Sequence, residues 1–253
     1  MSESTQRFSN RVADYVRYRP NYPNGILKAL EASCGLNSSS VVADVGSGTG
    51  ISTELFLRNG HTVFAVEPND EMRAAAEKWL VGDPHFHSVK GTAEATSLGN
   101  HGVDFVVAGQ AFHWFDQLKS RAEFNRILKP SGWVILIWNE RLVDATPFLQ
   151  AYEHLLEQFA TDYKQVDHRQ IDERVLAAFF SPQKFEFRTF PNHQDFDYDG
   201  LQGRLLSSSY APDATHPNHA PMLAQLKRIF DTNQESGRIK FLYSTKVYFG
   251  RLE

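Results

Sequence analysis

The sequence predicts an α/β fold, in which a mostly parallel β-sheet carries helices on both faces. Strand-like and helical segments alternate between residues 41 and 140. The strand-like segments are continuously apolar, as in VVADV (41–45) and WVILIW (133–138), which is typical of parallel strands buried on both faces. A glycine-rich turn at 46–50 joins the first of these strands to a helix, as in βα units that bind nucleotides.

Each element is predicted from apolar periodicity and from the residues that stop it. The strands are expected at 41–45, 61–67, 86–89, 103–108, 133–138, 185–190 and 239–251. The helices are expected at 24–34, 51–58, from Asn69 or Asp70 to about Leu80, at 116–128, within 145–181, within 199–210 and at 220–233, with a tight turn at 129–132. After Glu140 the alternation changes, so the chain is expected to form a single domain (1–253). Its parts are a core at 35–140, an N-terminal cap at 1–34, substrate-side helical and strand additions at 141–235 and a final strand at 236–253.

Composition narrows the classes of function. The chain has 253 residues, of which 42% are hydrophobic, enough for a well-formed core. The formal net charge of -4 gives no electrostatic reason to expect nucleic acid or an anionic membrane as a partner. One cysteine, Cys34, and a polar N-terminal segment without a secretory pattern predict a cytoplasmic protein, and the oligomeric state stays open.

The turn Gly46-Ser47-Gly48-Thr49-Gly50 suits a nucleotide-like ligand. Glycines allow a sharp turn and a close approach of the backbone, and the helix that follows offers free amide groups. A plain βα turn is the alternative. The spacing G-x-G-x-G differs from the G-x-G-x-x-G of dinucleotide sites, and the loop lacks the Lys-Ser or Lys-Thr of a P-loop.

Glu67 ends the next predicted strand. A carboxylate at this position can accept hydrogen bonds from both hydroxyls of a ribose. It would also repel a 2′-phosphate, which argues against NADP.

VVADVGSGTG followed by VFAVEPNDEMR resembles the first two motifs of the class I S-adenosylmethionine-dependent methyltransferases. The segments YRPxYP (18–23) and RLLSSSY (204–210) extend the likeness to the small-molecule "type 11" subgroup that includes trans-aconitate methyltransferases. The resemblance implies a Rossmann-like sheet of seven strands, mostly parallel with an antiparallel last strand, and a helical insertion that forms a lid. It implies S-adenosylmethionine as the cofactor and S-adenosylhomocysteine as its product.

The resemblance also implies the roles of individual residues. Asp44 would lie near the methionine amino group, Glu67 would bind the ribose, and Gln110 and Ala111 would lie against the methionine portion. The remaining cofactor-binding residues implied by the family are Gly46, Ser47 and Gly48 in the loop, Pro68 and Met72 beside the adenine, and Ala93 and Glu94 at its edge.

Three further residues have two interpretations each. His113 follows the fourth strand, where α/β ligands bind, so it is the candidate catalytic base; alternatively it only shapes the loop. Trp114 forms either a wall of the substrate pocket, which His113 would share, or part of the core. Arg19 either binds the cofactor carboxylate or is solvated before the proline turn. His85 and His87 lack a third ligand, so no metal site is expected.

The sequence therefore predicts an enzyme that transfers the methyl group of S-adenosylmethionine to a small molecule. An oxygen of a carboxylic acid or a phenol is the expected acceptor. The alternatives are an S-adenosylmethionine-binding regulatory protein without catalysis and an NAD-linked oxidoreductase on a similar sheet.

Overall fold

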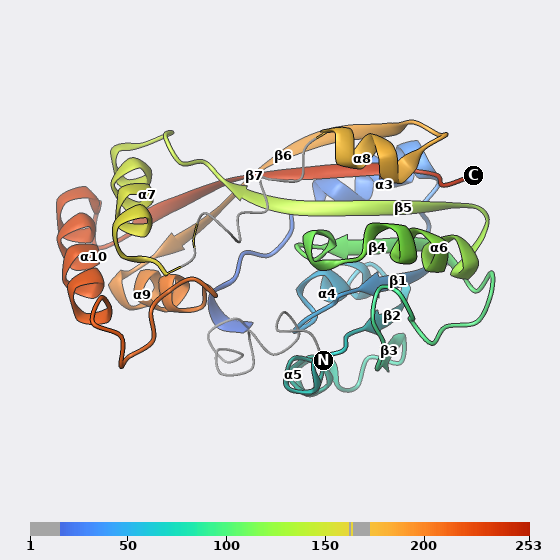
Figure 1. The fold of residues 1–253 in the computed structure, drawn as a ribbon, viewed down its shortest axis with the longest axis horizontal. Coiled ribbons are helices and arrows are strands. Elements are labelled where there is room, and N and C mark those ends of the chain that lie inside the picture. The colour runs from blue at the N-terminus through green and yellow to red at the C-terminus, as the bar shows by residue number, and fades with distance from the viewer. Residues whose placement is uncertain (1–15, 162, 164–172) are drawn as a thin grey trace.

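The computed structural model describes residues 16–161, 163 and 173–253. A seven-stranded sheet runs through the described chain in the order β3-β2-β1-β4-β5-β7-β6 (Figure 1). The strands are β1 (Val41–Val45), β2 (Thr62–Val66), β3 (Phe86–Val89), β4 (Val103–Gly109), β5 (Leu128–Arg141), β6 (Phe185–Phe196) and β7 (Ile239–Gly250). The helices are α3 (Gly25–Cys34), α4 (Ile51–Leu57), α5 (Asp70–Leu80), η2 (Phe112–Trp114), α6 (Gln117–Ile127), α7 (Pro147–Phe159), α8 (Glu173–Phe180), α9 (Tyr198–Leu206) and α10 (His219–Asn233).

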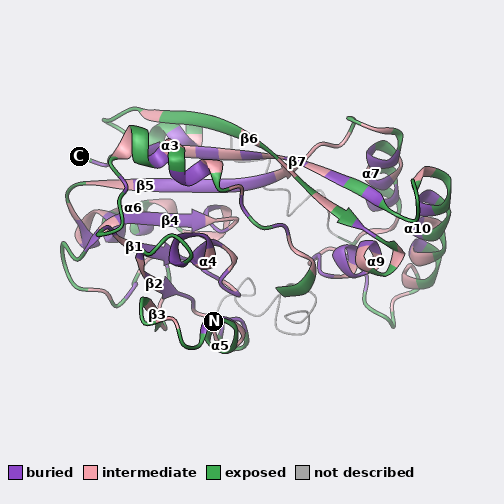
Figure 2. Ribbon diagram, turned by 180° about the vertical axis from the view of Figure 1, so that it is seen from behind, coloured by how far each residue is buried: buried purple, intermediate pink, exposed green. Residues whose placement is uncertain are grey.

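The predicted fold class is confirmed. Strands β1 to β5 pair in parallel, whereas β7 is antiparallel to both β5 and β6. The apolar side chains of α3 and α4 pack on one face of the sheet, and those of α6 and α8 pack on the other. The strands between these layers are almost entirely buried (Figure 2), which explains their continuous apolar sequence.

A second body of helices lies at one end of the long strands. Helices α7, α9 and α10 gather there, away from the parallel part of the sheet (Figure 1). They share a hydrophobic cluster with the first residues of β7 and the last residue of β6, including Phe241, Tyr243 and Phe196. The single-domain organisation stays a prediction, and residues 1–15 of the expected cap and 164–172 of the expected helical region lie outside the described residues.

Two predicted boundaries are wrong. Strand β6 extends to Phe196, beyond the predicted end at residue 190, although it contains Pro191. It is the outermost strand and most of its residues are exposed or half-buried, and an edge strand tolerates a proline that cannot donate. The tight turn predicted at 129–132 lies within β5, as an irregularity in the pairing of β5 with β4.

In the described part of the chain, none of the helices is both long enough and apolar enough to cross a bilayer.

Candidate functional site

The loop between β1 and α4 depends on glycine for its shape. Gly46, Gly48 and Gly50 have φ angles of 70°, 57° and 92°, in the left-handed region. A Cβ atom on Gly46 would lie 2.6 Å from the Cβ of Ala111. The amides of Gly46 and Ser47 both donate to the carbonyl of Val66, which ties the loop to the end of β2. The loop therefore brings backbone from β1 close to the segment that follows β4.

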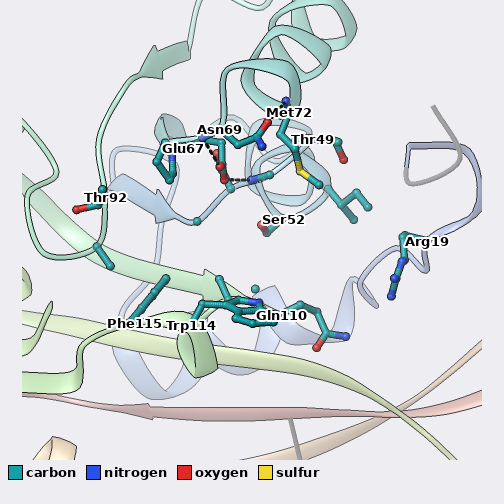
Figure 3. Close-up of a pocket in the computed structure, with 18 of the residues that line it drawn as sticks. Arg19, Thr49, Ser52, Glu67, Asn69, Met72, Thr92, Gln110, Trp114 and Phe115 are labelled. Atoms are coloured by element: carbon teal, nitrogen blue, oxygen red, sulfur yellow. Dashed lines mark hydrogen bonds between the residues drawn. The ribbon is translucent and has the colours of Figure 1, made fainter. Parts of the chain in front are cut away.

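The carboxylate of Glu67 is fixed at the end of β2. Its Oε2 accepts a hydrogen bond from the amide of Gly48 at 2.9 Å, and its Oε1 accepts one from the amide of Asn69 at 2.8 Å (Figure 3). Burial raises the pKa of Glu67, and the two amides oppose that shift. Each oxygen keeps lone-pair capacity for another donor. The carboxylate is thus oriented in advance to accept bonds from a ligand with two neighbouring hydroxyl groups.

Asp44 is buried beneath the loop. Its Oδ2 accepts hydrogen bonds from the hydroxyls of Ser52 at 2.7 Å and Thr53 at 2.6 Å, both in α4. Its Oδ1 is buried and has no hydrogen-bond partner. Burial raises the pKa of Asp44 to about 6, against the lowering effect of the bonds from Thr53 and Ser52. Asp44 was predicted to contact a ligand, but it is not among the residues that line the cavity described next.

These elements surround a cavity of about 590 Å³. This volume falls in the range of small-molecule and cofactor sites, roughly 300–1,000 Å³. Figure 3 shows Glu67 and Arg19 on opposite sides of the cavity, with Gln110, Trp114 and Phe115 along one wall. The lining residues are Arg19, Pro20, Tyr22, Gly46, Ser47, Gly48, Thr49, Ile51, Ser52, Glu67, Pro68, Asn69, Met72, Thr92, Ala93, Glu94, Gly109, Gln110, Ala111, Trp114, Phe115, Asp116, Lys119 and Asn139.

Most of the residues expected at the cofactor line this cavity. They come from five separate parts of the chain, and the parallel sheet brings them to one edge. Two expected residues, Asp44 and His113, are not in the wall. The lining residues that match the sequence expectation are Arg19, Gly46, Ser47, Gly48, Glu67, Pro68, Met72, Ala93, Glu94, Gln110, Ala111 and Trp114.

Of the neighbours His113 and Trp114 in the short helix η2, only Trp114 lines the cavity. Trp114 lies in the cavity wall, which agrees with the interpretation of a pocket wall. His113 is half-buried and its ring packs against that of Trp114, with centroids 4.7 Å apart. The geometry of the described residues therefore does not bring His113 to the cavity, and its role as a base is not part of the function proposed below.

The sequence prediction missed several lining residues. The hydroxyl of Tyr22 approaches Gly109, where an added Cβ would lie 2.7 Å from it. The sequence also gave no sign of the backbone conformation of Gln110, a residue that it did predict at the cofactor: its φ angle is 56°, and its amide donates to the carbonyl of Ile137 at 2.8 Å. Backbone held in this region by a non-glycine residue often marks a binding site. Tyr22, Thr49 and Asn69 lie within motifs quoted for the resemblance but were not assigned to the ligand, and Asn139 gave no separate signal of a ligand contact.

Helices α7, α9 and α10 contribute none of the described residues in the cavity wall. The expected helical insertion exists, and its closing over the cavity as a lid stays a prediction. Arg19 connects the two regions, because it lies in the wall while its Nη2 donates to the carbonyl of Ser207, just after α9, at 2.9 Å.

Comparison with known proteins identifies the central segment. Residues 43–136 match the family model described as a methyltransferase domain. This segment is a methyltransferase domain. It begins within β1, contains the glycine loop, the acidic residue Glu67 and β2 to β4, and ends within β5.

The similar proteins agree with this family. An uncharacterised methyltransferase-like protein of Schizosaccharomyces pombe is 27% identical over 250 residues, which cover 97% of this chain and 95% of that protein. A second methyltransferase of the same yeast is 32% identical over 152 residues, which cover 60% of this chain and 59% of that one. A solved structure of a type II methyltransferase from Anaeromyxobacter dehalogenans has a TM-score of 0.67 at 20% identity and covers 93% of this chain and 98% of its own.

These findings confirm the enzyme class. The predictions of an S-adenosylmethionine-dependent methyltransferase and of S-adenosylmethionine as the cofactor agree with the matched family model and the similar protein of Schizosaccharomyces pombe. The predicted Rossmann-like sheet agrees with the structural neighbour. The finer likeness to trans-aconitate methyltransferases stays a prediction.

Proposed function

We propose that this methyltransferase acts on an oxygen of a small carboxylic acid or phenol, by in-line displacement, with the cofactor bound between Glu67 and Arg19. The observation that carries the cofactor's placement is the carboxylate of Glu67, held by two backbone amides and facing the cavity with accepting capacity left. In this proposal Glu67 binds the ribose hydroxyls, and Met72, Ala93 and Glu94 surround the base.

The residues present fit the cofactor. The glycines of the loop leave the ligand side of β1 without side-chain bulk. The unpartnered Oδ1 of Asp44 gives the loop a buried negative group that favours an ammonium ion nearby. Arg19, across the cavity, matches a carboxylate. Asp44 then acts on the methionine amino group through the field it sets up beneath the loop.

The chemistry requires alignment more than proton transfer. When bound, S-adenosylmethionine supplies a methyl group already activated by the positive charge on sulfur. Trp114 and Phe115 wall off one side of the cavity and exclude water there. Gln110 fixes the backbone at the end of β4, with its Nε2 donating to the carbonyl of Asn139 at 3.2 Å. Holding two reactants in line supplies about 7–11 kcal/mol of the barrier.

A carboxylate acceptor needs no general base, which agrees with the position of His113 away from the wall. A phenol would need a group that removes its proton. The geometry therefore favours the carboxylate of the two acceptor classes.

Calorimetry with S-adenosylmethionine and NAD tests the cofactor site. We expect micromolar-range binding of S-adenosylmethionine, no binding of NAD, and an increase in Kd of about 100-fold or more in Glu67→Ala, because two charge-assisted hydrogen bonds are lost. Glu31→Ala, at an exposed position of α3, is the matched control and keeps the wild-type Kd. Unchanged affinity in Glu67→Ala would overturn the assignment of the ribose site. Binding without methyl transfer to any acid or phenol would favour a regulatory protein.

A further inference from the structure

A cluster of buried polar side chains lies between β5, β7 and the helices α7 and α9. We call it the arginine–tyrosine cluster and define it as Arg141, Arg204, Tyr152, Tyr210 and Tyr243. Its residues do not line the cofactor cavity, and it differs from a hydrophobic core because two guanidinium groups are buried in it.

Arg204 is buried without a carboxylate partner. Its Nε donates to the hydroxyl of Tyr243 at 3.1 Å and its Nη1 to the hydroxyl of Ser208 at 3.1 Å. Its guanidinium also lies over the ring of Phe241, 5.5 Å from the centroid. Within the described chain its hydrogen bonds use Nε and Nη1 only, and all of its partners are neutral. A buried cation with neutral partners alone is expensive, so such a group is usually paired with an anion.

Arg141 lacks a partner for one nitrogen. Its Nη2 binds the carboxylate of Glu153 and the hydroxyl of Tyr163, the latter at 2.6 Å. Its Nη1 is buried and has no hydrogen-bond partner, and the same holds for the hydroxyl of Tyr152, over whose ring the guanidinium lies at 5.0 Å. Two unpartnered polar atoms, one of them a charged donor, therefore meet at this place.

The pKa of Tyr210 reflects the excess of positive charge in the cluster. Burial would raise its pKa, but the guanidinium groups of Arg204, Arg141 and Arg19 outweigh burial and lower it. Three arginines thus act on one hydroxyl, and Glu153 is the carboxylate that the described residues pair with Arg141. The local potential is positive, which is the field an anionic ligand requires.

The cluster is next to the cofactor cavity. Arg19 lies in the cavity wall and binds the carbonyl of Ser207, whose neighbour Ser208 binds Arg204. On β5, Asn139 lies in the wall and Arg141 follows two residues later, on the same side of the strand. Figure 3 shows Arg19 on the side of the cavity opposite Glu67, so the cluster borders the end away from the ribose site.

We propose that Arg141 and Arg204 form an anion site for the methyl acceptor, which holds one carboxylate of a small acid while a second carboxylate faces the cofactor. This inference rests on the proposed function. A carboxylate clamped by guanidinium groups is a poor nucleophile, so a different carboxylate of the same molecule reacts. Its oxygen forms a bond to the methyl carbon while the carbon–sulfur bond breaks, and the electron pair stays on sulfur. No proton has to be removed.

The test measures binding of straight-chain diacids from malonate to adipate, by calorimetry, to the protein saturated with S-adenosylhomocysteine. The diamides of the same lengths serve as neutral counterparts. We expect at least one diacid to bind with a saturable Kd and its diamide to bind at least about tenfold more weakly. If the wild-type protein bound diacid and diamide equally, or bound none of the diacids, the proposed anion site would be overturned.

The variants Arg141→Gln and Arg204→Gln locate the site. Each is expected to weaken diacid binding by about 10- to 100-fold while the Kd of S-adenosylhomocysteine changes by less than about threefold. Arg204→Lys keeps the charge without the planar fork and should fall in between. Arg188→Gln, on the exposed face of β6, is the control and leaves diacid binding unchanged.

The outcomes separate this inference from the proposed function. Loss of diacid binding in Arg19→Gln, with Arg141→Gln and Arg204→Gln unaffected, would move the acid to the cavity wall and overturn the cluster's role. Methylation of phenols without any response to diacids would leave methyl transfer standing and overturn the anion site. Failure of wild type to bind S-adenosylmethionine would instead overturn the proposed function.

Discussion

The cofactor cavity and the arginine–tyrosine cluster are neighbours built in opposite ways. The cavity is formed mostly by loops at the ends of parallel strands, where a glycine-rich turn and the oriented carboxylate of Glu67 face it. The cluster is formed by long side chains from β5, β7, α7 and α9. The backbone conformation of the loops gives the cofactor cavity its shape for a ligand. The arginine–tyrosine cluster would attract a ligand through charges that are incompletely paired in the fold.

The largest effect is expected at Gly46, where the backbone conformation of the cavity loop is tested. Gly46→Ala should raise the Kd of S-adenosylmethionine by about 100-fold, because the new Cβ meets Ala111 and forces the loop to move. Gly60→Ala is the matched control: Gly60 also has a positive φ angle, 81°, but its Cβ would meet nothing within 4 Å. Calorimetry checks both variants. Equal effects of the two substitutions would show that backbone strain alone, and not the cavity, requires Gly46.

The dependence of stability on pH tests the raised pKa of Asp44, which is buried beneath the glycine loop of the cavity. The pKa of about 6 in the folded protein exceeds the ordinary value of 3.8, so the folded state binds more protons than the unfolded state between these values. The contribution of Asp44 to stability therefore falls as the pH rises from about 4 to about 6, by up to about 3 kcal/mol.

In Asp44→Asn this contribution is absent. The free energy of unfolding of wild type, relative to this variant, should thus decrease over the same pH interval, as measured by urea denaturation at several pH values. A constant difference between the two proteins would contradict the buried, raised carboxyl group.

Replacing two tyrosines of the cluster tests whether their hydroxyl groups have hydrogen-bond partners. Tyr243→Phe should lower the free energy of unfolding by about 1–3 kcal/mol, because the hydroxyl accepts from Arg204 and donates to Gln194. Tyr152→Phe removes a buried hydroxyl without a partner and should leave stability unchanged or raise it. Denaturant unfolding of both variants gives the answer, and a large loss in Tyr152→Phe would mean that its hydroxyl is bound after all.

Two helix caps give the smallest contrast. The side chain of Asn69 caps α5 by accepting from the amide of Met72, and that of Asp197 caps α9 by accepting from the amide of Gly200. Replacing either by alanine should cost about 1 kcal/mol of stability. Only Asn69→Ala should also weaken S-adenosylmethionine binding, because Asn69 lies in the cavity wall. Equal cofactor affinity in both variants would remove Asn69 from the site.

The same contrast explains what the sequence could predict. The cavity loop, Glu67 and the segment after β4 are local patterns on consecutive βα units, so their positions at one sheet edge follow from topology. The direction of the Asp44 side chain, toward Ser52 and Thr53 instead of the cavity, depends on how α4 packs on β1. His113 could not be placed either, because the sequence does not show which side chains of the short helix η2 reach the cavity.

The cluster could not be predicted from the sequence. Arg141 meets Tyr243 through the register of β5 with β7, more than a hundred residues apart in the chain. Arg204 joins them from α9 only because α9 packs at the end of those strands. Contacts of this kind depend on tertiary packing and leave no periodic pattern in the sequence. The extension of β6 past Pro191 is a similar case, because its polar residues become a strand only by pairing with β7.

The place of β7 has a consequence for synthesis of the protein. It is the last strand of the described chain, yet it lies between β5 and β6. It pairs with β6 from Ile239 to Gly250 and with β5 from Tyr243 to Gly250. While a ribosome is still making the residues of β7, the nascent chain exposes the unpaired edge of β5, with Val134 to Trp138 in it. The parallel half, with its glycine loop, can form before that moment. The anion-binding half cannot, so a growing chain would gain the cofactor's binding surface before the acceptor's.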